Sequence, residues 1–84
     1  MSSVTCFAVQ AAPSPHVLSR VFDLLARHGV VPSRCHTHVE PEAGLLIDLH
    51  LAGVDARLVE KLHHGLRRLV DVDDVLIAAK LGAD

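Results

Sequence analysis

The sequence predicts a single α+β domain in which a strand–helix–strand unit is followed by a second strand–helix–strand unit. Apolar and polar residues alternate with a period of two in residues 4–11 and 45–52, which is typical of half-buried strands. Apolar residues recur at helical spacing after Pro15 and again after Asp55, between helix start and stop signals. Both halves therefore have the order of a split βαβ motif. A chain of 84 residues is long enough for one hydrophobic core.

The first half predicts one strand and one helix. Residues 4–11 alternate so that one face is expected to be buried, with Phe7, Val9 and Ala11 on it. Ser14 before Pro15 is a typical N-cap followed by proline in the first turn, and Gly29 favours a left-handed helix end. We expect a helix over residues 15–28 that buries Leu18, Val21, Phe22 and Leu25.

The second half begins with two strands. Residues 31–40 alternate, and Pro32 places this strand at an edge of the sheet, where a missing backbone donor costs little. Residues 45–52 form the next strand, with its inward face made of Leu45, Ile47, Leu49 and Leu51.

A helix capped by Asp55 and a last strand complete the chain. The helix is expected to bury Leu58, Leu62, Leu66 and Leu69, to expose the pair His63 and His64, and to be weakened slightly by Gly65. Residues 72–79 are rich in Val and Ile and predict the fourth strand. We expect residues 80–84 to form a frayed tail outside a core of about residues 4–79.

Two interleaved right-handed crossovers give a four-stranded antiparallel sheet in the order 4-1-3-2, with both helices on one face. This is the ferredoxin-like βαββαβ fold, and it leaves the strand of residues 31–40 at an open edge. Long regular edges are normally covered by pairing, so we expect a homodimer through this strand. The expected contact residues are Arg34, Cys35, His36, Thr37 and His38.

Composition argues against several classes of partner. The net charge of −2 gives no electrostatic reason to bind nucleic acid. The N-terminus lacks the basic and apolar regions of a signal peptide and no run is long enough to span a bilayer, so we expect a cytoplasmic protein without membrane contact.

Cys6 and Cys35 are expected on opposite faces of non-adjacent strands, which predicts free thiols rather than a disulfide.

Three segments of the chain together resemble a known family. They are Pro15-x-x-Leu18-x-Arg20-Val21, Arg27-His28-Gly29-Val30, and Leu69-Val70-Asp71-Val72 with Val75. The chain resembles the ACT domain of acetohydroxyacid (acetolactate) synthase small regulatory subunits, most closely the short single-ACT type of isozyme II. The resemblance implies a non-catalytic subunit that binds and activates the acetolactate synthase catalytic subunit in branched-chain amino-acid biosynthesis. It also implies that thiamine diphosphate, Mg and FAD belong to that catalytic partner, and that this chain holds no cofactor.

The resemblance also points to a ligand site for a small amino acid at the first helix. In valine-responsive members the turn before this helix carries an Asn and a Gly, whose places are taken here by Pro13 and His16. A ligand carboxylate would be held by backbone N–H groups at the helix N-terminus, which proline lacks and histidine crowds. We therefore expect weak or absent valine binding, and any amino acid that binds is expected at Pro13, Ser14, His16 and Val17.

The histidines of the sheet leave a metal site open as an alternative. A five-residue loop between residues 40 and 46 would place His50 opposite His36 and Asp48 opposite His38, a set that could ligate zinc. We favour a solvated open face without metal, because the Cys and His spacings of closed zinc sites are missing. The alternative functions are thus a free-standing ACT amino-acid sensor dimer and a metal-binding ferredoxin-like dimer. No nucleophile has a recognisable activating partner, so we expect no catalytic residues.

Overall fold

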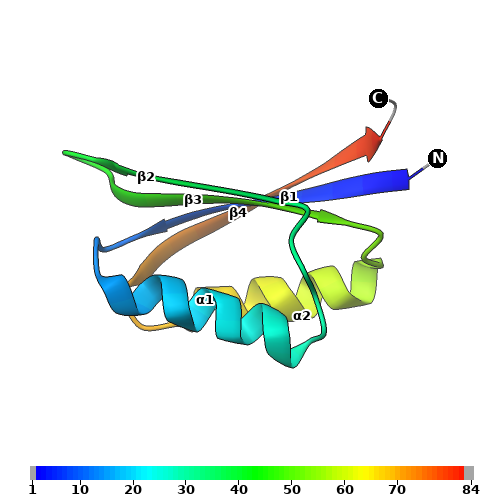
Figure 1. Ribbon diagram of the computed structural model, residues 1–84, viewed down its shortest axis with the longest axis horizontal. Helices are drawn as coiled ribbons and strands as arrows, with labels where there is room; N and C mark the ends of the chain where they lie inside the picture. The colour runs from blue at the N-terminus through cyan, green and yellow to red at the C-terminus, as the bar shows by residue number, and fades with distance from the viewer. Residues whose placement is uncertain (1, 83–84) are drawn as a thin grey trace.

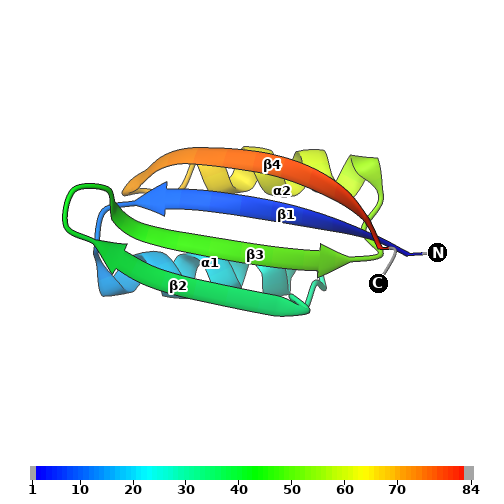
Figure 2. The same ribbon diagram turned by 90° about the horizontal axis from the view of Figure 1, so that it is seen from above.

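The computed structural model describes residues 2–82 and has both helices packed on one face of a four-stranded sheet (Figure 1). The elements in chain order are β1 (Ser2–Ala11), α1 (Pro15–Arg27), β2 (Arg34–Glu40), β3 (Gly44–Ala52), α2 (Ala56–Arg67) and β4 (Val72–Gly82). The strands are antiparallel and lie in the order β2-β3-β1-β4, which Figure 2 shows from the side without helices. The predicted ferredoxin-like fold and its strand order are confirmed.

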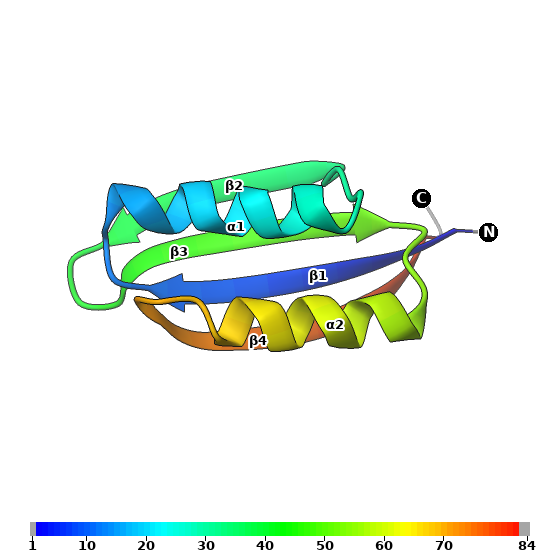
Figure 3. The same cartoon turned by 90° about the horizontal axis from the view of Figure 1, so that it is seen from below.

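The hydrophobic core fills the layer between the sheet and the helices. Phe7 of β1 and the inward residues of β3 are fully or almost fully buried, as the alternation predicted. In Figure 3, α1 lies beneath β2 and β3 and α2 lies beneath β1 and β4, so each helix covers about half of the sheet. The two helices contribute Val17, Val21, Leu24, Leu25, Leu62 and Leu66 to this core.

Both helices begin at the predicted caps. The Ser14 side chain accepts a hydrogen bond from the His16 N–H, and Asp55 Oδ1 accepts one of 2.8 Å from the Leu58 N–H. The predicted buried stripe of α1 is wrong at one position, because Phe22 is 40% exposed. The stripe instead runs through Val17, Val21, Leu24 and Leu25, which turns Phe22 outward.

Several predicted boundaries differ from the structure, most at the starts of β1 and β2 and at the ends of α2 and β4. β2 begins at Arg34 rather than residue 31, because the N–H and hydroxyl of Ser33 both donate to the His50 carbonyl, at 2.8 and 3.0 Å, outside the regular ladder. α2 ends at Arg67, so Leu69 packs against the core from the following loop. β4 continues to Gly82 by pairing with residues 2–4 of β1, so residues 80–82 are strand rather than frayed tail. Residues 83–84 lie outside the described residues.

Two glycines lie where a Cβ would come closer than 3.0 Å to neighbouring atoms. Gly44 has a φ of +84°, and a Cβ there would lie 2.7 Å from the Ala11 carbonyl oxygen. Gly65 faces α1, where a Cβ would lie 2.9 Å from both Cδ atoms of Leu24. The glycine that was expected only to weaken α2 therefore leaves room for the Leu24 side chain, which would have to move if position 65 carried a Cβ. No helix within residues 2–82 has the length and apolar character needed to cross a membrane.

Candidate functional site

The β2 strand forms one edge of the sheet and is exposed along its whole length. All seven residues of Arg34–Glu40 are exposed, and this strand is hydrogen-bonded to β3 alone within residues 2–82 (Figure 2). The structure thus places Arg34, Cys35, His36, Thr37 and His38 on a regular edge with unpaired backbone groups. Such an edge is a template for pairing with another strand.

The register of β2 against β3 differs from the prediction. His36 pairs with Asp48 and Arg34 pairs with His50, whereas His38 pairs with Leu46. The predicted pairs, His50 opposite His36 and Asp48 opposite His38, are wrong by two residues because the connecting loop has three residues instead of five. Within residues 2–82 of one chain, no group of three or more His, Cys, Asp or Glu side chains is placed to hold a metal ion.

Polar contacts link the histidines of the open face to their neighbours. The rings of His36 and His38 have centroids 5.8 Å apart and are tilted by 59°. His38 Nε2 lies 3.5 Å from Glu40 Oε2, and the two side chains remain 43% and 51% exposed. On the inner strands, His50 Nδ1 lies 3.6 Å from Cys6 Sγ. The β2 edge therefore presents two accessible imidazoles, one with a carboxylate beside it.

Both cysteines are free, as predicted. Cys6 lies on β1 and Cys35 on β2, which are separated by β3. Partial burial raises the pKa of the Cys35 thiol, and the negative charge of Asp48 raises this pKa further. The thiol is thus held protonated at neutral pH, which disfavours a nucleophilic role for Cys35.

The open face of the sheet is hollowed between its polar edge and β4. A cavity of about 170 Å³ lies between His38 and Asp48 on one side and Leu76 on the other, over a floor that includes Ala8 and Leu46. Leu76 is 64% exposed although it is a large apolar residue. This face combines an apolar centre with charged margins, a pattern found where proteins contact one another.

The predicted ligand turn adjoins a separate shallow cavity of about 180 Å³. Pro13 and Ser14 line it together with Leu18, Val39 and Leu45. His16 is exposed and does not line this cavity, whereas Val17 is fully buried in the core, so its side chain cannot contact a ligand in the cavity.

Every backbone N–H group of this turn already has an acceptor. Ala12 donates to the Asp71 carbonyl at 2.8 Å and Ser14 donates to the Ala12 carbonyl at 2.7 Å. His16 donates to the Ser14 hydroxyl, Val17 donates to the Ser14 carbonyl, and the two prolines have no N–H. Residues 12–17 therefore offer no free backbone donor to a ligand carboxylate.

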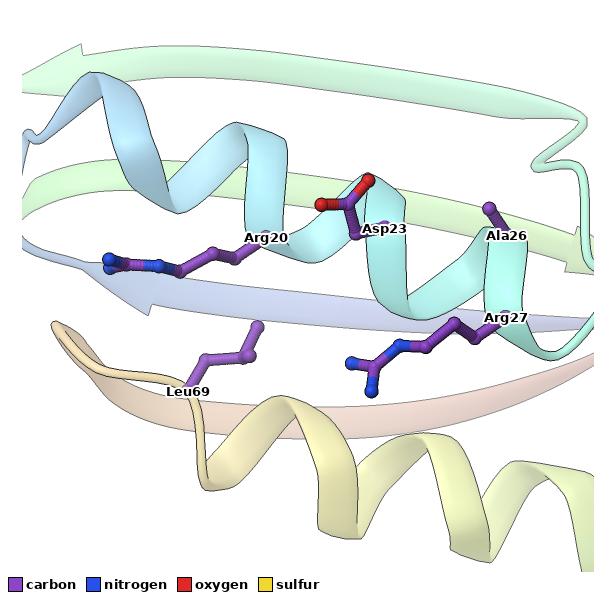
Figure 4. A pocket seen from close by; sticks show the side chains of 5 residues that line it. All are labelled: Arg20, Asp23, Ala26, Arg27 and Leu69. Atoms are coloured by element: carbon purple, nitrogen blue, oxygen red, sulfur yellow. The ribbon is translucent and has the colours of Figure 1, made fainter.

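A groove of about 410 Å³ separates α1 from the end of α2. Figure 4 shows the side chains of Arg20 and Arg27 lying along it, with Leu69 on the opposite wall. Asp23 contributes a negative charge to the α1 wall. Guanidinium groups bind carboxylates and phosphates well, but the charged residues among the lining residues, Arg20, Asp23 and Arg27, are all exposed and none is held in place by burial.

The prediction that His63 of α2 is exposed is wrong. His63 is half-buried, and its Nε2 lies 3.3 Å from the Val75 carbonyl oxygen of β4, whereas His64 is exposed as predicted. Because a carbonyl oxygen only accepts, His63 Nε2 carries the proton in this contact. His63 is thus a packing residue between α2 and β4.

Comparison with known proteins identifies the fold. Neither the family models nor the curated proteins contain a match to this sequence. Among solved structures, the ACT domain from GTP pyrophosphokinase of Chlorobium tepidum superposes with a TM-score of 0.77 at 8% identity, covering 93% of this chain and all of that one. The chain therefore has the fold of an ACT domain.

Two further structures show how widely this fold is used. The C-terminal domain of the MgtC protein from Mycobacterium tuberculosis matches with a TM-score of 0.71 at 14% identity, covering all of this chain and 93% of that one. The regulatory subunit of aspartate kinase from Thermus flavus matches with a TM-score of 0.65 at 10% identity, covering 94% of this chain and 54% of that one. Proteins with different names share the fold, so the function has to be argued from the site.

Proposed function

We propose that the chain is a non-catalytic regulatory subunit that forms a homodimer through β2 and acts by contacting a catalytic partner. The observation that carries the proposal is the seven-residue edge strand, which is exposed over its whole length. The fold similarity to an ACT domain and to the regulatory subunit of aspartate kinase supports a regulatory role.

Charge favours one register for this dimer. When two copies of β2 pair antiparallel about a two-fold axis at Thr37, all seven residues of each strand are paired. Arg34 of each copy then lies opposite Glu40 of the other, so opposite charges meet at both ends of the interface. A shift by two residues in either direction loses these ion pairs and leaves strand ends unpaired.

The proposed catalytic partner is an acetolactate synthase catalytic subunit. The proposal is supported by the resemblance of the first helix and of residues 69–75 to small subunits of that enzyme. The apolar centre of the open sheet face, around Leu76, offers this partner a surface that remains free in a dimer formed through β2.

The test measures association and activation together. We expect the purified chain to sediment as a dimer, to form no acetolactate by itself, and to raise acetolactate formation by the catalytic subunit from the same organism. A monomer at high concentration would contradict the dimer. A dimer that neither binds nor activates this subunit would make the free-standing amino-acid sensor the leading function.

We expect valine to have little effect on the stability of the chain. A ligand that binds only the folded state raises stability by mass action, and residues 12–17 lack free donors for its carboxylate. Thermal unfolding and calorimetry with valine, leucine and isoleucine measure this directly. The variant carrying Pro13→Asn and His16→Gly should bind more tightly, although the glycine costs up to about 1 kcal/mol of helix stability. Submillimolar binding to the unmodified chain would contradict this prediction.

A further inference from the structure

We propose that the dimer binds one transition-metal ion of the Zn²⁺ class on its two-fold axis, through His36 and His38 of both copies. This inference rests on the dimer of the proposed function and on the register centred on Thr37. The site is absent from a single chain, since within residues 2–82 one copy has no cluster able to hold a metal. The second copy therefore completes the site.

The pairing geometry brings four imidazoles together. His36 and His38 project from the open face of β2, with ring centroids 5.8 Å apart. About Thr37, His36 of one copy lies directly opposite His38 of the other, with Cβ atoms about 5 Å apart. Residues two apart on a strand are separated by about 7 Å, so the four side chains rise from the corners of a small rectangle on one face.

The side chains can adjust to a common ion. Tetrahedral zinc with Zn–N bonds of about 2.0–2.1 Å requires its four nitrogens to lie within about 3.5 Å of one another. Both residues are exposed, so rotation about χ1 and χ2 is not opposed by packing. Imidazole ligands suit Zn²⁺, Cu²⁺ and Ni²⁺, whereas Mg²⁺ and Ca²⁺ prefer oxygen.

Carboxylates stand beside the imidazoles. Asp48 of β3 lies directly across from His36, and Glu40 Oε2 lies 3.5 Å from His38 Nε2. A carboxylate that accepts a hydrogen bond from one ring nitrogen orients the ring and makes the other nitrogen a better ligand. The two copies together supply four such carboxylates, which balance the charges of the divalent ion and the two Arg34 side chains.

The experiment uses the full chain without an affinity tag. Sedimentation equilibrium in EDTA first gives the oligomeric state without metal, and calorimetric titration with Zn²⁺ then gives stoichiometry and affinity. We expect one ion per two chains. His36→Ala and His38→Ala should each weaken binding by more than the 10- to 100-fold that loss of a second-shell partner costs. His64→Ala, at an exposed position of α2, is the matched control and should bind as the unmodified chain does.

The outcomes separate this inference from the proposed function. A dimer in EDTA that binds no Zn²⁺, or binds it equally well after His36→Ala, overturns the metal site and leaves the dimer standing. A monomer in EDTA that dimerises with half an equivalent of Zn²⁺ supports the site and makes the metal a part of the interface. A chain that is monomeric with and without Zn²⁺ overturns both proposals.

Discussion

The Arg34→Glu variant is expected to dimerise about 10- to 100-fold more weakly than the unmodified chain. In the register centred on Thr37, the new glutamate lies opposite Glu40 of the second copy, so both ends of the interface change from attraction to repulsion. Directly opposed charges contribute roughly 0.2–1 kcal/mol per pair, and reversing two pairs changes the association free energy by about 1–3 kcal/mol. Sedimentation equilibrium at one fixed salt concentration measures the change, since screening weakens such pairs.

Two variants show whether the effect belongs to this register. Arg34→Glu combined with Glu40→Arg restores opposite charges at both ends and should restore dimerisation. Arg57→Glu, on the exposed start of α2, changes the net charge by the same amount without touching β2, so it should leave dimerisation unchanged. If Arg57→Glu weakens dimerisation as much as Arg34→Glu does, repulsion between the net charges of the two chains is the cause. If the variant with both Arg34→Glu and Glu40→Arg still dimerises weakly, the register centred on Thr37 is incorrect.

The element order was predictable because each element carries its own periodic signal. Alternation in β1 and β3 identified their buried faces, and the caps at Ser14 and Asp55 fixed where both helices begin. The β2–β3 register was not predictable in the same way. A slip of two residues leaves every side chain on the same face, so alternation does not distinguish a three-residue loop from a five-residue loop.

The missed contacts depend on packing between distant segments. Two overlapping apolar stripes exist on α1, one with Phe22 and one with Leu24, and packing against distant segments, including α2 at Gly65, selects between them. His63 resembles a surface residue in the sequence, and its partner is a carbonyl of β4, twelve residues away. The end of β4 was missed for the same reason, because residues 80–82 become strand only by pairing with the start of β1.

More of the turn before α1 than of the histidine edge on β2 could be predicted from the sequence. Pro13 and Pro15 already indicated a turn poor in backbone donors, and the hydrogen bonds of Ala12 and Val17 extend that conclusion. Val17 was predicted as a ligand contact with the rest of this turn, whereas its side chain is buried in the core. For the histidine edge, the sequence indicated the residues, whereas their arrangement around a metal depends on a second copy.

The Gly65→Val variant is expected to lower the free energy of unfolding by roughly 2 kcal/mol, within the usual cost of overpacking a core. A Cβ at this position already lies 2.9 Å from both Cδ atoms of Leu24, and the two further methyl groups of valine enter the same space. The higher helix propensity of valine offsets only a few tenths of a kcal/mol. For a domain of this size, thermal unfolding should occur about 8–16 °C lower.

In the Leu24→Ala background, Gly65→Val is expected to stabilise the protein instead of destabilising it. Leu24→Ala alone should cost about 2–5 kcal/mol, because it leaves a cavity where the helices meet. Adding Gly65→Val then fills part of that cavity, so the double variant should unfold at a higher temperature than Leu24→Ala alone. His64→Val, at the exposed neighbouring position, controls for propensity and should stay within about 0.5 kcal/mol of the unmodified chain. Additive effects of the two substitutions would show that Gly65 and Leu24 do not share this contact.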